Sequence, residues 1–273
     1  MSDHAGAVEA YQTDAIEAYL SAILSPGIAA AAAVLAGLLA DDVVVQTSFG
    51  TADGVDAVLA LLREPRLAGL LAAGAHWSPP SADGDRVLVT ATLPATAPFG
   101  GLELSFHFAG AKISRVEHLT FPPAPVPPEE LRLTDDIKRA VNGALDNKTP
   151  MLIAYRDDGN EIHLSFRGSI QAYGDEALAL WARDPDGGLP RNIAARPQVT
   201  LFYHDPASRT SYSFYGRARV AVEPAARATI YAGANPREQQ ADFSQRGVAI
   251  VVDLDKVEGR SQAGRILMLR STA

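Results

Sequence analysis

The segment PPAPVPP at residues 122–128 places five prolines within seven residues. Proline fixes φ and favours the extended polyproline conformation, so such a run forms a semi-rigid spacer rather than a helix or a central strand. The chain of 273 residues is also longer than the roughly 100–150 residues of a common single domain. We therefore expect two α+β domains, at residues 1–121 and 131–273, joined by a linker at residues 122–130.

The composition is that of an ordinary globular protein, with 47% hydrophobic and 21% charged residues and a net charge of -8. The negative charge disfavours binding to nucleic acid or to anionic lipid. Cysteine is absent, which excludes disulfides, thiolate zinc sites and cysteine nucleophiles and fits a reducing compartment. The sequence contains no Walker A loop, Rossmann fingerprint, His-Glu-x-x-His or Gly-x-Ser-x-Gly motif, so ATPase, zinc-protease and ordinary serine-hydrolase functions lose support.

The first domain shows neither a secretory signal nor a membrane-spanning segment. Residues 1–9 lack a basic segment followed by an apolar core, as a secretory signal requires. The longest apolar run, residues 28–40, is shorter than the roughly 20 residues that span a bilayer, and we interpret it as a buried, alanine-rich helix. We expect a cytoplasmic protein.

Upstream of the linker, hydrophobic spacing predicts helices first and strands afterwards. A Pro26-Gly27 breaker separates the two opening helices, and Asp41-Asp42 is expected to end the second one. The expected helices cover residues 7–24, 28–40 and 53–72, the last with a break at Pro65. The expected strands cover residues 43–47, 76–78, 86–93, 102–108 and 113–120.

The last two of these strands form a hairpin with a turn at residues 109–112. Its first strand alternates, with Leu104, Phe106 and Phe108 on one face and polar residues on the other. We expect the polar face, which carries Glu103, Ser105 and His107, to meet solvent.

Downstream of the linker, Thr134 is expected to cap a helix that runs to residue 145, and the pattern then becomes mostly strand. Helices are expected only at residues 187–195 and 224–232. Many short strands with few helices favour a closed or partly closed barrel over a doubly wound sheet. The expected strands cover residues 151–156, 162–166, 177–182, 199–204, 212–222, 248–257 and 266–269.

The second half resembles the flavin-binding split β-barrels of the pyridoxamine 5'-phosphate oxidase-like family. The resemblance rests on five ordered stretches, which are PMLIAYRDDG at 150–159, HLSFRGS at 163–169, LALWAR at 178–183, GGLPRNIAARPQV at 187–199 and FYGRARV at 214–220. It extends from the linker nearly to the C-terminus. It implies a homodimeric flavoprotein that holds FMN in a groove between subunits and acts as an oxidoreductase on a small organic substrate.

The resemblance also implies which residues contact the cofactor, namely Arg167, Gly168, Ser169, Gln171, Trp181, Arg183, Gly187, Gly188, Leu189, Arg191 and Asn192. A guanidinium and a hydroxyl at the end of a strand can donate to phosphate or to flavin carbonyls. A Gly-Gly pair that opens a helix brings backbone N–H groups toward an anion, and a tryptophan offers a flat face to the isoalloxazine. No catalytic residue and no metal ligand is assigned.

The positions of the histidines disfavour one substrate and one cofactor known in this family. The family's pyridoxamine-phosphate oxidases carry an Arg-x-His element near the C-terminus, whereas residues 265–273 contain no histidine, so oxidation of vitamin B6 is disfavoured. Haem is disfavoured too, because His163 and His204 are the only nearby histidines and a lone strand histidine is more often structural. The deazaflavin F420 stays open as an alternative cofactor, and a non-catalytic flavin or F420 binding or sensing protein stays open as an alternative function.

The first half is similar to the NTF2-like or SnoaL-like cone at residues 39–45 and 112–119. Such cones enclose an apolar pocket, in which isomerase and cyclase members move protons next to a carbonyl. The candidate polar groups are Asp42, His76, His107, Glu117 and His118. A ligand-binding or dimerisation module is the simpler expectation for this half, and proton-transfer chemistry is the alternative.

Overall fold

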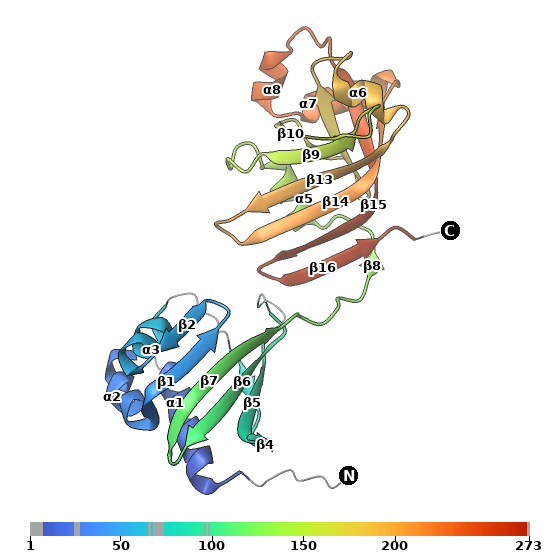
Figure 1. Cartoon of the computed structure of the whole chain (residues 1–273). Coiled ribbons are helices and arrows are strands. Elements are labelled where there is room, and N and C mark those ends of the chain that lie inside the picture. Colours follow the sequence, from blue (N-terminus) through green and yellow to red (C-terminus); the bar gives the residue numbers. More distant parts are fainter. Residues whose placement is uncertain are drawn as a thin grey trace. The chain divides into compact units, whose positions relative to one another are not determined.

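The computed structural model describes residues 8–24, 28–64, 67, 74–94, 97 and 99–271. The chain divides into two compact units, Met1–Pro125 and Val126–Ala273, and the division falls inside the proline-rich segment (Figure 1). Each unit combines helices with one mostly antiparallel sheet. Across the ranges given above, no helix is long and apolar enough to cross a membrane.

The first unit packs helices against a sheet with the strand order β2-β1-β7-β6-β5-β3, to which β4 is added beside β5. Strand β1 runs parallel to β7, and the other pairs are antiparallel. The helices are α1 (Ala10–Leu24), α2 (Ile28–Leu38) and α3 (Val55–Leu62) in the described part of the unit. The strands there are β1 (Leu39–Thr47), β2 (Gly50–Asp53), β3 (His76–Trp77), β4 (Ser81–Asp83), β5 (Arg86–Thr92), β6 (Gly101–Ala109) and β7 (Lys112–Phe121).

Helix α2 and strand β1 differ from the prediction. The helix ends at Leu38, and Asp41 and Asp42 lie inside β1 instead of stopping the helix. Strand β1 starts early because Leu39 pairs with Ile113 of β7, and this pairing outweighs the local signal of the two acids. Helix α2 is not fully buried either, since Val34 is 50% exposed. The break expected at Pro65 lies outside the described residues.

The hairpin of β6 and β7 confirms the predicted inward face for Leu104 and Phe106, which are fully buried. Ser105 is also fully buried, contrary to the expected solvent face, because it lies in the middle of the sheet between Glu117 and Leu88 on the neighbouring strands. An irregularity in register follows His107, and Phe108 is only partly buried.

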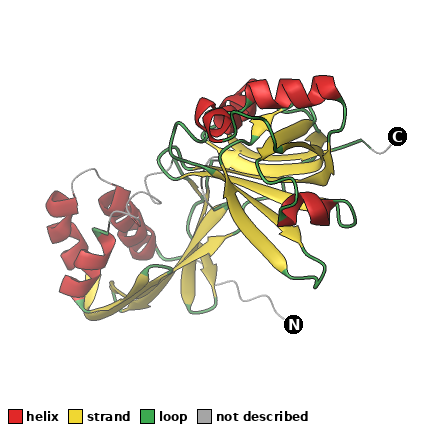
Figure 2. Cartoon of the chain, turned by 90° about the horizontal axis from the view of Figure 1, so that it is seen from above, coloured by secondary structure: helices red, strands yellow, loops and turns green. Residues whose placement is uncertain are grey.

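The second unit has a larger sheet with the order β10-β9-β13-β14-β15-β12-β11, to which β16 and β8 are added beside β15. Figure 2 shows its long strands twisted and bent rather than flat. The strands are β8 (Glu129–Glu130), β9 (Met151–Arg156), β10 (Ile162–Arg167), β11 (Gln171–Ala172), β12 (Ala177–Ala182), β13 (Gln198–Asp205), β14 (Thr210–Val220), β15 (Val248–Ser261) and β16 (Gly264–Leu269). The helices are α5 (Asp135–Asn142), α6 (Gly188–Ile193), α7 (Pro224–Gly233) and α8 (Pro236–Ala241).

This sheet is not a closed barrel, because its hydrogen-bonded path runs from β10 to β11 without joining the two as neighbours. Residues 168–170 nevertheless connect these end strands directly in the sequence, and so short a connection spans at most about 14 Å. The two ends of the sheet must therefore approach one another. The first site described below lies where they approach.

Side-chain caps begin two helices of the second unit. Thr134 accepts a hydrogen bond from the Ile137 amide at 3.4 Å, so the predicted cap of α5 is confirmed. Helix α8 was not predicted, because its sequence PREQQA has no apolar spacing. It begins instead where the Asn235 side chain accepts from the Arg237 amide at 3.0 Å.

Candidate functional site

A polar pocket of about 420 Å³ opens where β10 and β12 end beside α8. We call it the Arg167 pocket. Five of the eleven predicted cofactor residues line it, which are Arg167, Gly168, Ser169, Trp181 and Arg183. Its remaining lining residues are Phe166, Asp184, Glu238 and Ala241.

Arg167 is the residue of this pocket with unused hydrogen-bonding capacity. It ends β10 opposite Met151, and its Nε atom is buried with no partner among the residues that the structure describes. A buried N–H group without a partner is costly, and a guanidinium donates best to a carboxylate or a phosphate. The arrangement can therefore accept an anionic group.

Ser169 and Gln171 use their side chains inside the protein. The Ser169 hydroxyl donates to the Trp181 carbonyl oxygen at 2.8 Å and accepts from the Trp181 amide at 3.1 Å, which fastens the end of β10 to β12. The Gln171 amide nitrogen donates to the Ile230 carbonyl oxygen at 2.8 Å. Both residues are buried, so in this structure they hold the sheet and α7 in place.

Trp181 lies in the core between the sheet and α7. Its indole nitrogen donates to Asp242 at 2.9 Å, and Tyr231 meets the ring edge-on at 5.0 Å between centroids. The Arg227 guanidinium lies 4.6 Å from the ring centroid. With only 2% of the residue exposed, little of the indole is free to pack on a ligand.

Two carboxylates share the pocket with the two arginines. Glu238 of α8 lies 3.9 Å from the Arg183 Nε atom, and its Oε1 atom lies 2.6 Å from the position that a Cβ atom on Gly168 would occupy. Asp184 lines the pocket as well. The formal charges of Arg167, Arg183, Asp184 and Glu238 therefore sum to zero.

Six predicted cofactor residues do not line this pocket: Gln171 lies in β11, and the other five lie in or beside α6. Gly188 lies against β9, where a Cβ atom on it would be 2.6 Å from the Tyr155 hydroxyl. The Asn192 side chain donates to the Gly188 carbonyl oxygen at 2.7 Å. The helix contributes Leu189 and Ile193 to the core, while Gly187 is its N-cap and Arg191 lies in its last turn.

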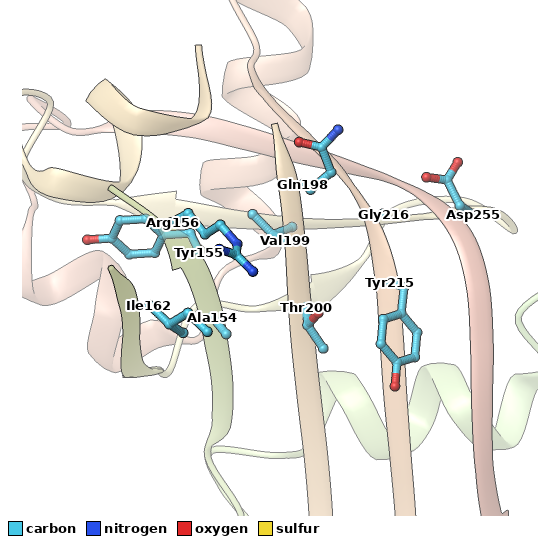
Figure 3. A pocket seen from close by; sticks show the side chains of 10 residues that line it. All are labelled: Ala154, Tyr155, Arg156, Ile162, Gln198, Val199, Thr200, Tyr215, Gly216 and Asp255. Carbon is cyan, nitrogen blue, oxygen red and sulfur yellow. The ribbon is translucent and has the colours of Figure 1, made fainter. Parts of the chain in front are cut away.

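A second pocket, of about 360 Å³, crosses the outer face of the sheet, and we call it the Tyr215 groove. Figure 3 shows its residues on neighbouring strands. No sequence motif indicated it. A change of register between Tyr215 and Gly216 leaves Asp255 without a partner in the β14–β15 pairing, and such a bulge can redirect a side chain. The lining is Ala154, Tyr155, Arg156, Ile162, Gln198, Val199, Thr200, Tyr215, Gly216 and Asp255.

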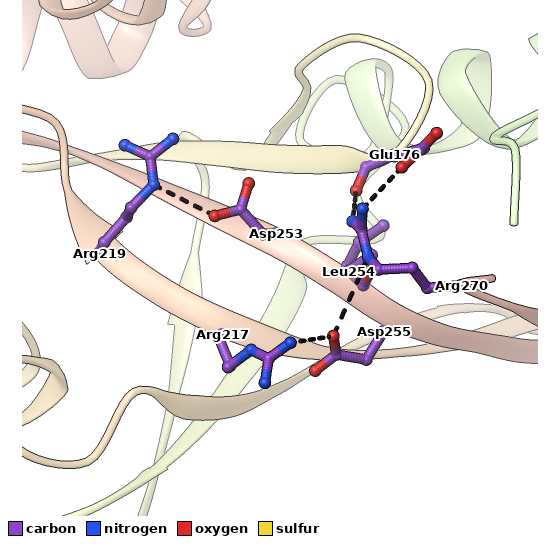
Figure 4. Close-up of polar contacts among 7 residues, drawn as sticks. All are labelled: Glu176, Arg217, Arg219, Asp253, Leu254, Asp255 and Arg270. Carbon is purple, nitrogen blue, oxygen red and sulfur yellow. Dashed lines mark hydrogen bonds and ion pairs between the residues drawn. The ribbon is translucent and has the colours of Figure 1, made fainter. Parts of the chain in front are cut away.

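The arginines of the FYGRARV stretch belong to ion pairs on β14 and β15 (Figure 4). Arg217 lies 2.9 Å from Asp255, and Arg219 lies 3.1 Å from Asp253. Arg270 donates to the Leu254 carbonyl oxygen at 2.6 Å, which ties the end of the chain to β15. These arginines therefore pair with groups of the sheet itself.

His163 lies in β10 and contacts two residues of the β9–β10 hairpin. Its Nε2 atom lies 2.7 Å from the Asp157 carboxylate, and its ring stacks on Tyr155 at 5.3 Å. The hydrogen bond with His163 is the main cause of a lowered Asp157 pKa. Glu161 brings a third ligand-type atom within 4.8 Å, at an exposed position where acidic groups are common without a metal.

In the first unit, His118 is the one buried residue among the five polar candidates, all of which the structure describes. Its Nε2 atom lies 3.4 Å from the Tyr19 hydroxyl, and its Nδ1 atom is buried with no partner in the described part of the chain. Burial lowers the His118 pKa to about 4 and raises the Tyr19 pKa. The neutral imidazole is therefore the stable form. The other four candidates, Asp42, His76, His107 and Glu117, are exposed or partly exposed.

No protein-family model and no curated protein matches this sequence. Solved structures similar to part of the chain include a putative pyridoxamine 5'-phosphate oxidase from Lactobacillus delbrueckii, with 17% identity and a TM-score of 0.35 over 47% of this chain and 95% of the other. General stress protein 26 from Bacillus anthracis has 12% identity and a TM-score of 0.36 over 45% and 92%. A putative polyketide cyclase from Sinorhizobium meliloti has 28% identity and a TM-score of 0.31 over 39% and 94%. Each likeness covers half of this chain or less, and its TM-score is too low to assign a function.

Proposed function

We propose that the second unit binds FMN and that the chain is an FMN-dependent oxidoreductase acting on a small organic substrate. The observation that carries this proposal is the buried, unpartnered Nε atom of Arg167 in a pocket that also holds Arg183. A phosphate oxygen would accept from both guanidinium groups and remove the cost of the unpaired donor. The resemblance of the second half to flavin-binding split barrels also supports the proposal.

The outer face of β10 offers a route for the rest of the cofactor. Ile162 lines the Tyr215 groove and Phe166 lines the Arg167 pocket, and both side chains are exposed. They lie on the same face of the strand, four residues and so about 13 Å apart. A molecule with a phosphate at one end and a flat ring at the other fits this spacing.

When bound, FMN supplies the hydride acceptor and donor. The chain's own residues bind and orient it. Arg167 and Arg183 hold the phosphate, and the row from Phe166 to Ile162 provides an apolar surface beside the ring. In the Tyr215 groove, hydroxyl groups of Thr200 and Tyr215 are available to position a substrate.

We expect Arg167→Ala to weaken FMN binding by about tenfold or more, because it removes a charged phosphate donor. Titration of the full chain with FMN, followed by quenching of flavin fluorescence, measures this. Arg260→Ala is the matched control, since Arg260 is an exposed arginine of β15 that lines neither pocket. Equal affinities for the two variants, or no uptake of FMN by the unmodified chain, would contradict the proposal. Turnover with reduced nicotinamide and oxygen or a quinone separates an oxidoreductase from a flavin-binding sensor.

We further propose that the second unit forms a homodimer through β10. The strand has a neighbour on one side only in the sheet path, and Ile162, Leu164 and Phe166 are 68%, 64% and 67% exposed. An exposed apolar row on an edge strand is a liability in a monomer and is typical of an association surface. A second copy laid on this row would also cover both pockets.

Leu164→Glu is expected to give a monomer of 28.9 kDa, since it places a charge in the middle of the apolar row. The native mass of this variant and of the unmodified chain, measured by light scattering, tests the expectation. Val222→Glu is the control, because Val222 is 78% exposed but lies outside the strand. A common mass for all three proteins would rule out the β10 dimer.

For the first unit we propose an NTF2-like module that binds a ligand or assists dimerisation. Helix α1 buries Tyr19 against Phe106 of β6, with 5.3 Å between the ring centroids, and encloses His118. This polar pair inside an apolar core supports a site for a small molecule that hydrogen-bonds to the free imidazole nitrogen.

A further inference from the structure

Glu238 brings a carboxylate into the Arg167 pocket, beside residues that we propose to bind phosphate. Its Oε1 atom lies against Gly168, 2.6 Å from the position of an absent Cβ atom, and its Oε2 atom lies 3.9 Å from Arg183. Only 21% of the Glu238 side chain is exposed. An acid so placed occupies Arg183, which would otherwise donate to a phosphate, while the Arg167 Nε atom keeps no partner.

Glu238 is held in this position by its neighbours on α8. The Asn235 side chain accepts from the Arg237 amide and donates to Asp146 at 3.0 Å. The Gln239 Nε2 atom lies 2.9–3.0 Å from three carbonyl oxygens at the end of α7, those of Tyr231, Ala232 and Ala234, which share its two N–H donors. The helix is therefore fastened on both sides of Glu238, and its backbone directs the carboxylate into the pocket.

Gly168 makes room for the carboxylate. A Cβ atom at this position would meet Glu238 Oε1 at 2.6 Å and Leu145 at 3.0 Å, so a larger residue would force Glu238 away. Residue 168 directly follows Arg167 at the end of β10. The close approach of Glu238 is thus built into the turn that also positions the arginine.

Resting on the proposed FMN site, we infer that Glu238 is a specificity-determining residue that competes with the phosphate of FMN. Two negative groups within ion-pair distance of the same arginine repel each other strongly in a partly enclosed site. Phosphate must displace the Glu238 carboxylate to reach Gly168 and Arg183. Glu238 therefore lowers the affinity for a doubly charged phosphate and leaves the affinity for uncharged riboflavin unaffected.

The test is calorimetric titration of the full chain with inorganic phosphate, FMN and riboflavin. We expect Glu238→Gln to bind phosphate and FMN about tenfold more tightly than the unmodified chain, with riboflavin unchanged. Glu223→Gln removes the same charge from an exposed position next to α7 and is expected to change none of the three affinities. Glu238→Asp keeps the charge, so its gain is expected to be smaller than that of Glu238→Gln. Trp181 fluorescence checks that each variant is folded.

The outcomes separate this inference from the flavin proposal. If Glu238→Gln gains phosphate affinity but neither protein binds FMN, the competition stands and the flavin assignment fails. If FMN binds the unmodified chain and Glu238→Gln equally well, the flavin assignment stands and the competition is overturned. An equal gain for riboflavin, or an equal gain in Glu238→Asp, would also overturn it, because either result would show that space rather than charge limits binding.

Discussion

Replacing Asp242 with alanine is expected to lower the free energy of unfolding of the second unit by about 2–4 kcal/mol. Asp242 is buried and accepts from the Trp181 indole nitrogen at 2.9 Å and from the Gly247 and Arg246 amides at 2.8 and 3.1 Å. Burial alone would raise the pKa of this carboxyl, but the hydrogen bonds outweigh it and the pKa is lowered. Alanine would leave buried donors without an acceptor, each at a cost of roughly 1–3 kcal/mol.

Urea unfolding followed by circular dichroism measures the loss of stability. Tryptophan emission, measured in a Trp77→Phe background so that Trp181 is the single tryptophan, reports whether its indole becomes exposed to water. Asp242→Asn keeps the shape and one acceptor oxygen, so its loss is expected to be smaller. Asp186→Ala removes an exposed acid of the same unit and serves as the control. The interpretation fails if Asp242→Ala unfolds at the same urea concentration as Asp186→Ala.

Asp242 also shows why the sequence could not settle how the predicted cofactor residues are used. Arg167 and Arg183, which the ordered stretches singled out, line one pocket, because Arg167 ends β10 and Arg183 directly follows β12. The partners of Trp181 and Gln171, Asp242 and Ile230, lie 61 and 59 positions away in the sequence. Whether a buried polar side chain faces a ligand or the protein depends on such distant partners, and local spacing does not reveal them.

Glu238 was missed for a related reason. Helix α8 has no apolar face, and its position depends on Asn235 and Gln239 hydrogen bonds rather than on burial. By contrast, the bounds predicted for β9 and β12, residues 151–156 and 177–182, are those of the structure, because each strand is a short, mostly apolar run. The apolar strands β9 and β12 could thus be predicted from the sequence. The short polar helix α8, which carries Glu238 into the pocket, could not.

In the first unit, protonation of His118 is expected to cost about 2 kcal/mol of stability between pH 8 and pH 5. Burial lowers the pKa of His118 from 6.5 to about 4, because the imidazolium would lose its hydration. Between these two values the unfolded chain binds a proton that the folded chain does not. Stability that is present above pH 6.5 is therefore lost as the pH falls toward 4.

His118→Gln removes the titration while it can still accept from the Tyr19 hydroxyl, which lies 3.4 Å from His118. Between pH 8 and pH 5, we expect the stability of this variant to fall by about 2 kcal/mol less than that of the unmodified chain. Hydrogen exchange of the β6 and β7 amides at pH 8 and pH 5 measures the stability of this unit alone. His76→Gln is the control, since His76 is exposed in the same unit. If His118→Gln keeps the pH dependence of this control, then acid destabilises the unit through other groups, and the buried imidazole is not its acid-sensitive element.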